Sequence, residues 1–159
     1  MTDRELVRHT VATLAYRAAK TMRGTPGTFA TFRPGPTSKT AVEIVAHMGD
    51  LLGWALSMAN GEGRWDAAVP QAWDGECARF FAALKAFDDL LASDEPIRYP
   101  LTRLFQGPIA DALTHTGQLA MLRRLHGVPM KGESYNRADV ALGRVGADQT
   151  PADPRYEFD

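Results

Sequence analysis

Three side chains that can bind a metal ion stand on two helices that the sequence predicts. His47 lies in the apolar run Ala-Val-Glu-Ile-Val-Ala-His-Met-Gly-Asp-Leu-Leu, which starts at Ala41. Asp111 and His115 are separated by one helical turn, so an α-helix presents both on the same face. Because a bare imidazole or carboxylate is costly to bury, we expect these core-facing groups to meet and to share a cation.

The residue types indicate which ion such a site would take. Two imidazoles and one carboxylate suit a divalent cation such as Zn²⁺, Ni²⁺, Fe²⁺ or Mn²⁺. Three protein ligands leave positions open for water or substrate, as in catalytic zinc sites, whereas the common structural sites need at least two cysteines. The chain has a single cysteine, Cys77, which excludes those structural sets and an internal disulfide. Gln118, one turn beyond His115, could orient a ligand or a bound water.

The same residues also have a purely structural interpretation. Asp111 and His115 can form an ion pair within one helix without any metal. A single core histidine such as His47 commonly hydrogen-bonds a backbone carbonyl, and Gln118 can do the same at the edge of the core. Spacing alone leaves both interpretations open.

Apolar residues at helical spacing predict four long helices and no strand before residue 128. The expected helices cover Asp3–Met22, Thr37 or Ser38 to Ala59, residues 71–92 and residues 108–127. Thr37 or Ser38 can cap the second helix, and Pro108 is a favoured first residue for the fourth. The pattern predicts an all-α protein whose residues 1–127 form an antiparallel-type four-helix bundle.

The remaining residues 128–159 are rich in Gly, Pro and Asp and show no sustained period. We expect them to form an irregular C-terminal arm packed on the bundle, within the same domain. The arm could close over the site as a lid, brace a dimer or serve as a structural strap. The residues of the arm that could make these contacts are Tyr135, Asn136, Arg137 and Arg144.

Bulk properties narrow the class of protein. The formal net charge is -1 and the hydrophobic fraction is 45%, so we expect no nucleic-acid partner and an ordinary globular core. No apolar run is long enough to span a bilayer, and the N-terminus lacks a signal-peptide pattern. Together with the single cysteine, these features predict a cytoplasmic protein with no membrane partner.

Several other polar and aromatic residues have two interpretations each. Asp50 is expected to be a solvated carboxylate, with support of a histidine as the alternative. Arg123 and Arg124 are expected to be solvated cations at a helix end, with binding of an anionic substrate as the alternative. Trp54 and Trp65 are expected in core packing, with the mouth of a pocket as the alternative.

Two stretches resemble the DinB/YfiT-like metalloenzyme family. The stronger is Gly-Pro-Ile-Ala-Asp-Ala-Leu-Thr-His-Thr-Gly-Gln-Leu-Ala-Met-Leu-Arg-Arg-Leu-His-Gly-Val-Pro from Gly107, and the weaker is Ala-His-Met-Gly-Asp-Leu-Leu-Gly-Trp from Ala46. The resemblance covers most of the chain and implies a bundle that holds one divalent metal through three histidines. His47 and His115 match two of them. Asp111 stands where many relatives have histidine, which changes ligand charge and softness.

The resemblance also implies an activity. Some relatives are transferases or isomerases that use a low-molecular-weight thiol such as mycothiol or bacillithiol. We therefore expect a metal-dependent transferase that activates such a thiol towards a small electrophile. The alternatives are a metal-dependent hydrolase that uses bound hydroxide and a non-catalytic dimerisation or ligand-binding bundle. A small-molecule substrate and a homodimer are the expected partners.

Overall fold

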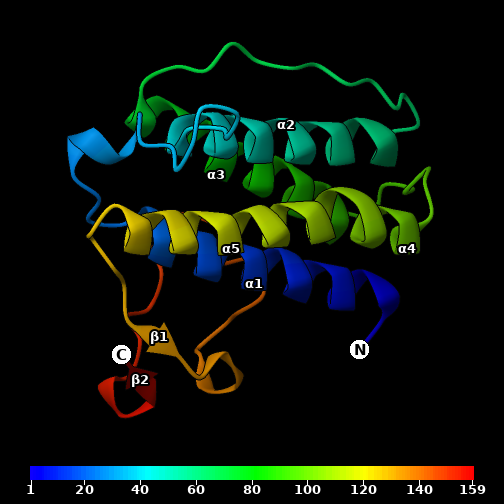
Figure 1. Cartoon of the computed structure of the whole chain (residues 1–159). Helices are drawn as coiled ribbons and strands as arrows, with labels where there is room; N and C mark the ends of the chain where they lie inside the picture. The colour runs from blue at the N-terminus through cyan, green and yellow to red at the C-terminus, as the bar shows by residue number, and fades with distance from the viewer.

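Four long helices lie side by side in the computed structural model, which describes all 159 residues (Figure 1). The helical elements are α1 Asp3–Met22, η1 Gly27–Phe29, α2 Ala41–Ala59, α3 Trp73–Ala92, α4 Leu101–Leu104, the π-helical segment η2 Phe105–Ile109 and α5 Ala110–Leu125. This arrangement confirms the predicted all-α four-helix bundle. One continuous core of 29 buried residues fills the space between the helices.

The helix boundaries agree with the sequence at α1 and differ at the start of α2. Thr40, rather than Thr37 or Ser38, caps α2, because only Thr40 forms a reciprocal capping box. The Thr40 hydroxyl accepts a hydrogen bond from the Glu43 backbone N–H, and the Glu43 carboxylate accepts one from the Thr40 N–H at 2.6 Å. Thr37 and Ser38 lie in the preceding turn.

Pro108 does not begin the last long helix, although proline is a favoured first helical residue and the sequence predicted a start there. It lies inside a continuous helical run in which α4, η2 and α5 follow one another without a break. A proline inside an α-helix lacks the N–H for its ladder hydrogen bond and clashes with the carbonyl four residues earlier, here that of Leu104. The wider π-helical turn around Pro108 accommodates both effects and sets the rotation of α5.

The bundle is not antiparallel throughout, which corrects the prediction from short connections. α2 and α3 run parallel, and residues 60–72 return along the whole length of α2 before α3 begins (Figure 1). The Arg98 N–H donates to the Ala59 carbonyl, so the ends of α3 and α2 lie together. α1 and α5 are also parallel, whereas the neighbouring pair α2 and α5 is antiparallel (Figure 1).

Arg123 joins the ends of the two parallel helices α1 and α5. Its side chain is buried, which corrects the expectation of a solvated cation. The guanidinium donates to the carbonyls of Thr21 and Arg23, at 3.2 and 2.7 Å, and to that of Val128 at 3.0 Å. The bonds to Thr21 and Arg23 satisfy carbonyl groups that the end of α1 leaves without partners. Burial lowers the pKa of Arg123.

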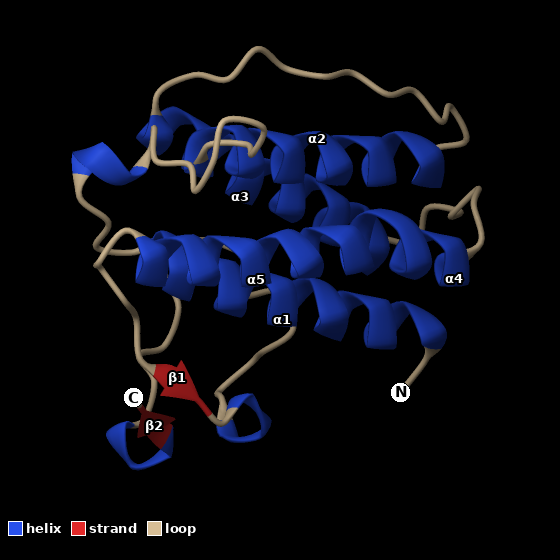
Figure 2. Cartoon of the chain, viewed as in Figure 1, coloured by secondary structure: helices blue, strands red, loops and turns tan.

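The C-terminal residues pack beside α1, where they form a strap. A two-residue antiparallel pair, β1 Gly132–Glu133 and β2 Glu157–Phe158, holds the arm together with the short helices η3 Tyr135–Arg137 and η4 Pro154–Tyr156 (Figure 2). The buried Glu133 carboxylate accepts hydrogen bonds from Tyr16 at 2.6 Å and from Lys20 at 2.7 Å. The arm therefore contacts the side of the bundle formed by α1. No helix in the molecule is both long and apolar enough to cross a membrane.

Two glycines of α2 allow a matched test of this packing. A Cβ on the exposed Gly53 would meet no atom within 4 Å, so Gly53→Ala should raise the free energy of unfolding by about 0.5–1 kcal/mol through helix propensity. A Cβ on Gly49 would lie 3.0 Å from the Arg79 guanidinium carbon, so Gly49→Ala should lower it instead. Urea denaturation of both variants measures the two changes; equal stabilisation by both would contradict the described position of Arg79.

Candidate metal centre

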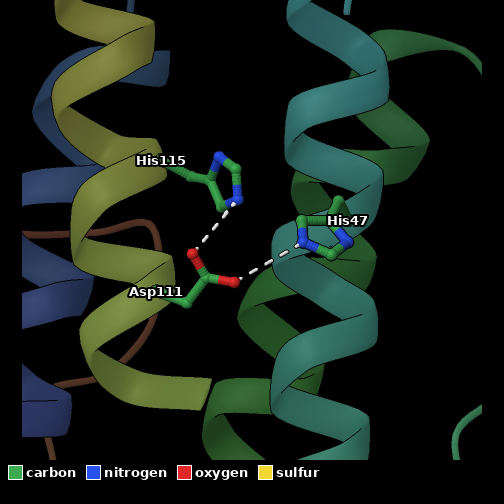
Figure 3. A group of neighbouring side chains, drawn as sticks. All are labelled: His47, Asp111 and His115. Atoms are coloured by element: carbon green, nitrogen blue, oxygen red, sulfur yellow. Dashed lines mark ion pairs between the residues drawn. The ribbon is translucent and has the colours of Figure 1, made fainter. Parts of the chain in front are cut away.

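His47 of α2 and the Asp111–His115 pair of α5 point towards one another between the two helices (Figure 3). Grooves lined by residues of both helices form a cleft there. The Asp111 carboxylate lies between the two imidazoles. Its Oδ2 is 3.7 Å from Nε2 of His47, and its Oδ1 is 3.4 Å from Nε2 of His115. The two imidazole rings stand almost perpendicular, with 4.8 Å between their centres.

Local sequence on each helix explains this convergence. Ile44 and Leu51, one turn before and one turn after His47, are buried, so the same face of α2 carries His47 towards α5. On α5, Asp111 and His115 are one turn apart and share the face that meets α2. α2 and α5 are antiparallel neighbours (Figure 1), and His47 lies at the level of this pair along the two helices.

The three side chains lie at the mouth of the cleft rather than deep in the core. The exposed fractions of the side chains are 14% for His115, 26% for His47 and 47% for Asp111. The sequence had suggested burial, because all three residues follow apolar positions. Partial exposure means that a small molecule can reach the cluster from solvent.

The spacing of the three ligand atoms can be compared with the needs of a metal ion. A cation about 2.1 Å from its ligand atoms holds tetrahedral ligands about 3.4 Å apart. The separations of 3.4 and 3.7 Å, which join the two imidazoles to different oxygens of Asp111, are close to this value. One ligand atom from each of the three residues lies within 4.8 Å of the others. Small side-chain rotations would bring His47 and His115 to the required distance, so the cluster could hold a metal ion.

Gln118 touches the cluster through the other nitrogen of His115. Its Oε1 lies 2.7 Å from Nδ1 of His115. This hydrogen bond occupies Nδ1 of His115, and the other ring nitrogen, Nε2, faces Asp111. The Nε2 atom that faces Asp111 is therefore the one able to ligate a cation.

The electrostatics of the cluster favour a neutral His47. Burial lowers the pKa of His47 most, the charge of His115 lowers it further, and the Asp111 carboxylate opposes both effects. Lys39, at the start of α2, also acts to lower the pKa of His47. Neutral imidazole is the form that binds metal, so the environment prepares His47 for that role.

Two tryptophans shield one side of the cluster. The ring of Trp65 packs edge-on against His47 with 5.8 Å between ring centres, and Trp54 packs against Trp65 at 5.7 Å. Trp65 belongs to the connection 60–72 that returns along α2. Trp54 packs against the core, as expected, and also lines a groove beside the cluster, whereas Trp65 is 44% exposed.

An ion-pair network that sequence reasoning missed holds this connection against α2 and α3. Arg79 donates to Asp50 and Glu76, both at 2.8 Å, and to the carbonyl of Ala46 at 2.6 Å. The Asp50 carboxylate also accepts from the Ala68 N–H at 3.3 Å. Asp50 is buried, so the expectation of a solvated carboxylate was wrong. Burial acts to lower the pKa of Arg79, but its bonds to Glu76 and Asp50 outweigh burial and raise it.

The sequence contains one weak indication of this network. Glu76 and Arg79 are three residues apart on α3, a spacing that allows a side-chain pair. The partner Asp50 is on another helix, and only the parallel packing of α2 on α3 brings it within reach. Sequence periodicity carries no information about that packing.

Two grooves continue the cleft on either side of the cluster. One, of about 450 Å³, has His115 and Gln118 in its wall and is bounded by the segment before α2. The other, of about 420 Å³, has Asp111 in its wall and is bounded by Trp54 and by Gly107 of the π-helical turn. The cluster therefore lies between two spaces that are large enough for a small organic molecule.

The remaining histidines and the cysteine lie elsewhere. His9 is exposed on α1, and His126 at the end of α5 contacts Thr28 with 3.1 Å between Nε2 and Oγ1. Cys77 lies on α3 beside Phe81, and burial raises the pKa of its thiol to about 12. This thiol is unreactive at neutral pH, because almost none of it is ionised.

Comparisons with known proteins add no functional assignment. No protein-family model matches the chain, and neither curated proteins nor solved structures give a match. The chemistry of the side chains in the α2/α5 cleft therefore provides the functional argument.

The electrostatic description of His47 can be tested on metal-free protein. We expect the pKa of His47 to lie below the ordinary value of about 6.5, to fall further in Asp111→Asn and to rise in His115→Asn. Because the unfolded chain binds this proton more readily, His47 should make stability decrease as pH falls below about 6.5. NMR titration of the ring protons measures each pKa, and a wild-type value at or above 6.5 would contradict the description.

Proposed function

We propose that this protein binds one divalent metal ion through His47, Asp111 and His115 and that the ion serves catalysis, as in the DinB/YfiT-like metalloenzymes. The observation that carries the proposal is the convergence of two imidazole nitrogens and a carboxylate from two helices within 4.8 Å. The donors suit Zn²⁺, Ni²⁺, Fe²⁺ or Mn²⁺, since each of these ions accepts imidazole and carboxylate ligands.

The chemistry of the donor set argues for a catalytic ion over a structural one. Structural zinc sites usually enclose the ion with four protein ligands, whereas this cluster offers three and remains half-open to solvent at Asp111. A cation bound there would lower the pKa of a water molecule or a thiol and so supply a nucleophile.

The residues around the cluster have separate parts in this proposal. Gln118 orients the imidazole of His115 through Nδ1, and Asp111 supplies the negative charge that attracts a cation. Trp65 covers one face of His47 and limits access of water on that side. The two flanking grooves leave room for a substrate larger than water.

We further propose that the reaction is transfer of a low-molecular-weight thiol to a small electrophile. The thiolate sulfur would form a bond to the electrophilic carbon, the leaving group would depart with the bonding pair, and the thiol proton would pass to solvent. The apolar wall of the groove beside His115 favours an organic co-substrate over water alone.

Metal binding itself is the first test. Purified protein stripped with chelator should take up one equivalent of Zn²⁺ in isothermal titration calorimetry. His47→Ala and His115→Ala should each weaken binding by at least about 100-fold, because outer-sphere partners alone change affinity about 10–100-fold. His9→Ala and His126→Ala are the matched controls, since both residues lie outside the cluster. Equal uptake by all five proteins would remove the proposal.

The type of reaction requires a second measurement. Zinc-loaded protein should accelerate conjugation of monochlorobimane to an added thiol such as cysteine, and His115→Ala should lose the acceleration. The same preparations are assayed with p-nitrophenyl acetate without thiol. Turnover of the ester alone would contradict thiol transfer and favour the metal-dependent hydrolase.

A further inference from the structure

The groove on the His115 side of the cluster has an unusual combination of walls. Met121 and Leu125 of α5 line it and are 56% and 57% exposed, although both are large apolar residues. Ile44 of α2 and Leu122 of α5, both buried in the core, form its apolar floor. The groove is therefore an apolar surface open to solvent beside the candidate metal centre.

A single cation stands at the rim of this groove. Lys39, in the segment before α2, lines the same space, is exposed and forms no ion pair within 4.0 Å. Glu43 is the carboxylate on the same helix end, and its charge is already engaged by the capping box with Thr40. The positive charge of Lys39 is thus available to an incoming ligand.

We propose that this groove binds an organic anion with an apolar body, which pairs its anionic group with Lys39 and lays its body along Met121 and Leu125. This inference rests on the proposed function, because the groove ends at His115 and would deliver the bound molecule to the metal. It assigns a substrate class, an amphipathic carboxylate, and makes Lys39 the residue that selects it.

The shape and polarity of the groove support a small molecule as the occupant. Its volume of about 450 Å³ falls in the range of small-molecule sites, which are mostly apolar with few polar groups. Polar groups line the same groove as the apolar residues; they are Lys39, Ser38 and the His115–Gln118 pair. One end of a ligand can therefore be charged while the rest contacts carbon atoms.

Three probes separate the charge from the apolar body. 4-Phenylbutyrate carries both, 4-phenylbutyramide lacks the charge, and butyrate lacks the ring. Binding to metal-free protein is followed by two-dimensional NMR, which locates the contact and gives the dissociation constant without a metal to attract the carboxylate. We expect 4-phenylbutyrate to bind about two- to fivefold more tightly than the amide, with shifts at Ile44 and Leu125. We expect it to bind at least about fivefold more tightly than butyrate, because butyrate lacks the apolar ring.

Matched variants identify the residues responsible. Lys39→Met keeps the length of the side chain and should weaken binding of 4-phenylbutyrate about two- to fivefold without changing binding of the amide. Lys85→Met is the control, because it removes the same charge from α3, where Lys85 pairs with Asp89. Leu125→Gln should weaken both aromatic probes, and its high exposure predicts an unchanged fold.

The outcomes separate this inference from the metal proposal. Equal affinity for the acid and the amide, equal effects of Lys39→Met and Lys85→Met, or shifts elsewhere would overturn the anion site, whatever the result of zinc titration. If the wild-type protein binds no zinc but the probes bind as expected, the catalytic metal ion and the substrate role of the anion are overturned. The anion site itself then still stands. A dimer that dissociates in Leu125→Gln would show that a second copy covers the groove and would also overturn the inference.

Discussion

The parallel packing of α2 on α3 is the constraint on which the rest of this structure depends. It forces residues 60–72 to return along α2, and a chain running over a helix needs partners for its backbone groups. Asp50, Glu76 and Arg79 supply them: Asp50 accepts from Ala68, Glu76 accepts from Gln71 at 2.8 Å, and Arg79 joins the two carboxylates. Because Asp50 and Glu76 are buried, removing one member of this network would leave an uncompensated buried charge and destabilise the fold.

The same constraint gives the candidate site its surroundings. With α3 parallel to α2, the remaining neighbour of α2 is α5, which approaches in the opposite direction (Figure 1). That approach sets His47 against Asp111 and His115, and the returning connection brings Trp65 over the His47 ring. Arg79 also donates to the carbonyl of Ala46, next to His47. One network thus supports both the helix that carries a ligand and the loop that shields it.

The site combines groups whose roles depend on one another. The Gln118 contact occupies Nδ1 of His115 while Nε2 faces Asp111, and burial lowers the pKa of His47. Such an arrangement is prepared for a cation, since neutral imidazoles and an ionised carboxylate are the ligating forms. The apolar groove with Lys39 at its rim adds a place for an organic anion beside that cation. The charged groups, the exposed side chains of the cluster and the apolar groove therefore all lie in the same part of the α2/α5 cleft.

The sequence by itself determined where the helices form and that Asp111 and His115 share one helix face. Periodic apolar residues predicted α1 over Asp3–Met22, and one-turn spacing put Asp111 and His115 on one face, because both signals are local. The start of α2 at Thr40, the π-helical turn at Pro108 and the burial of Asp50 and Arg123 were decided only by tertiary structure. So were the parallel order of α2 and α3 and the meeting of His47 with α5. Each depends on partners distant in the chain, which helix periodicity does not encode.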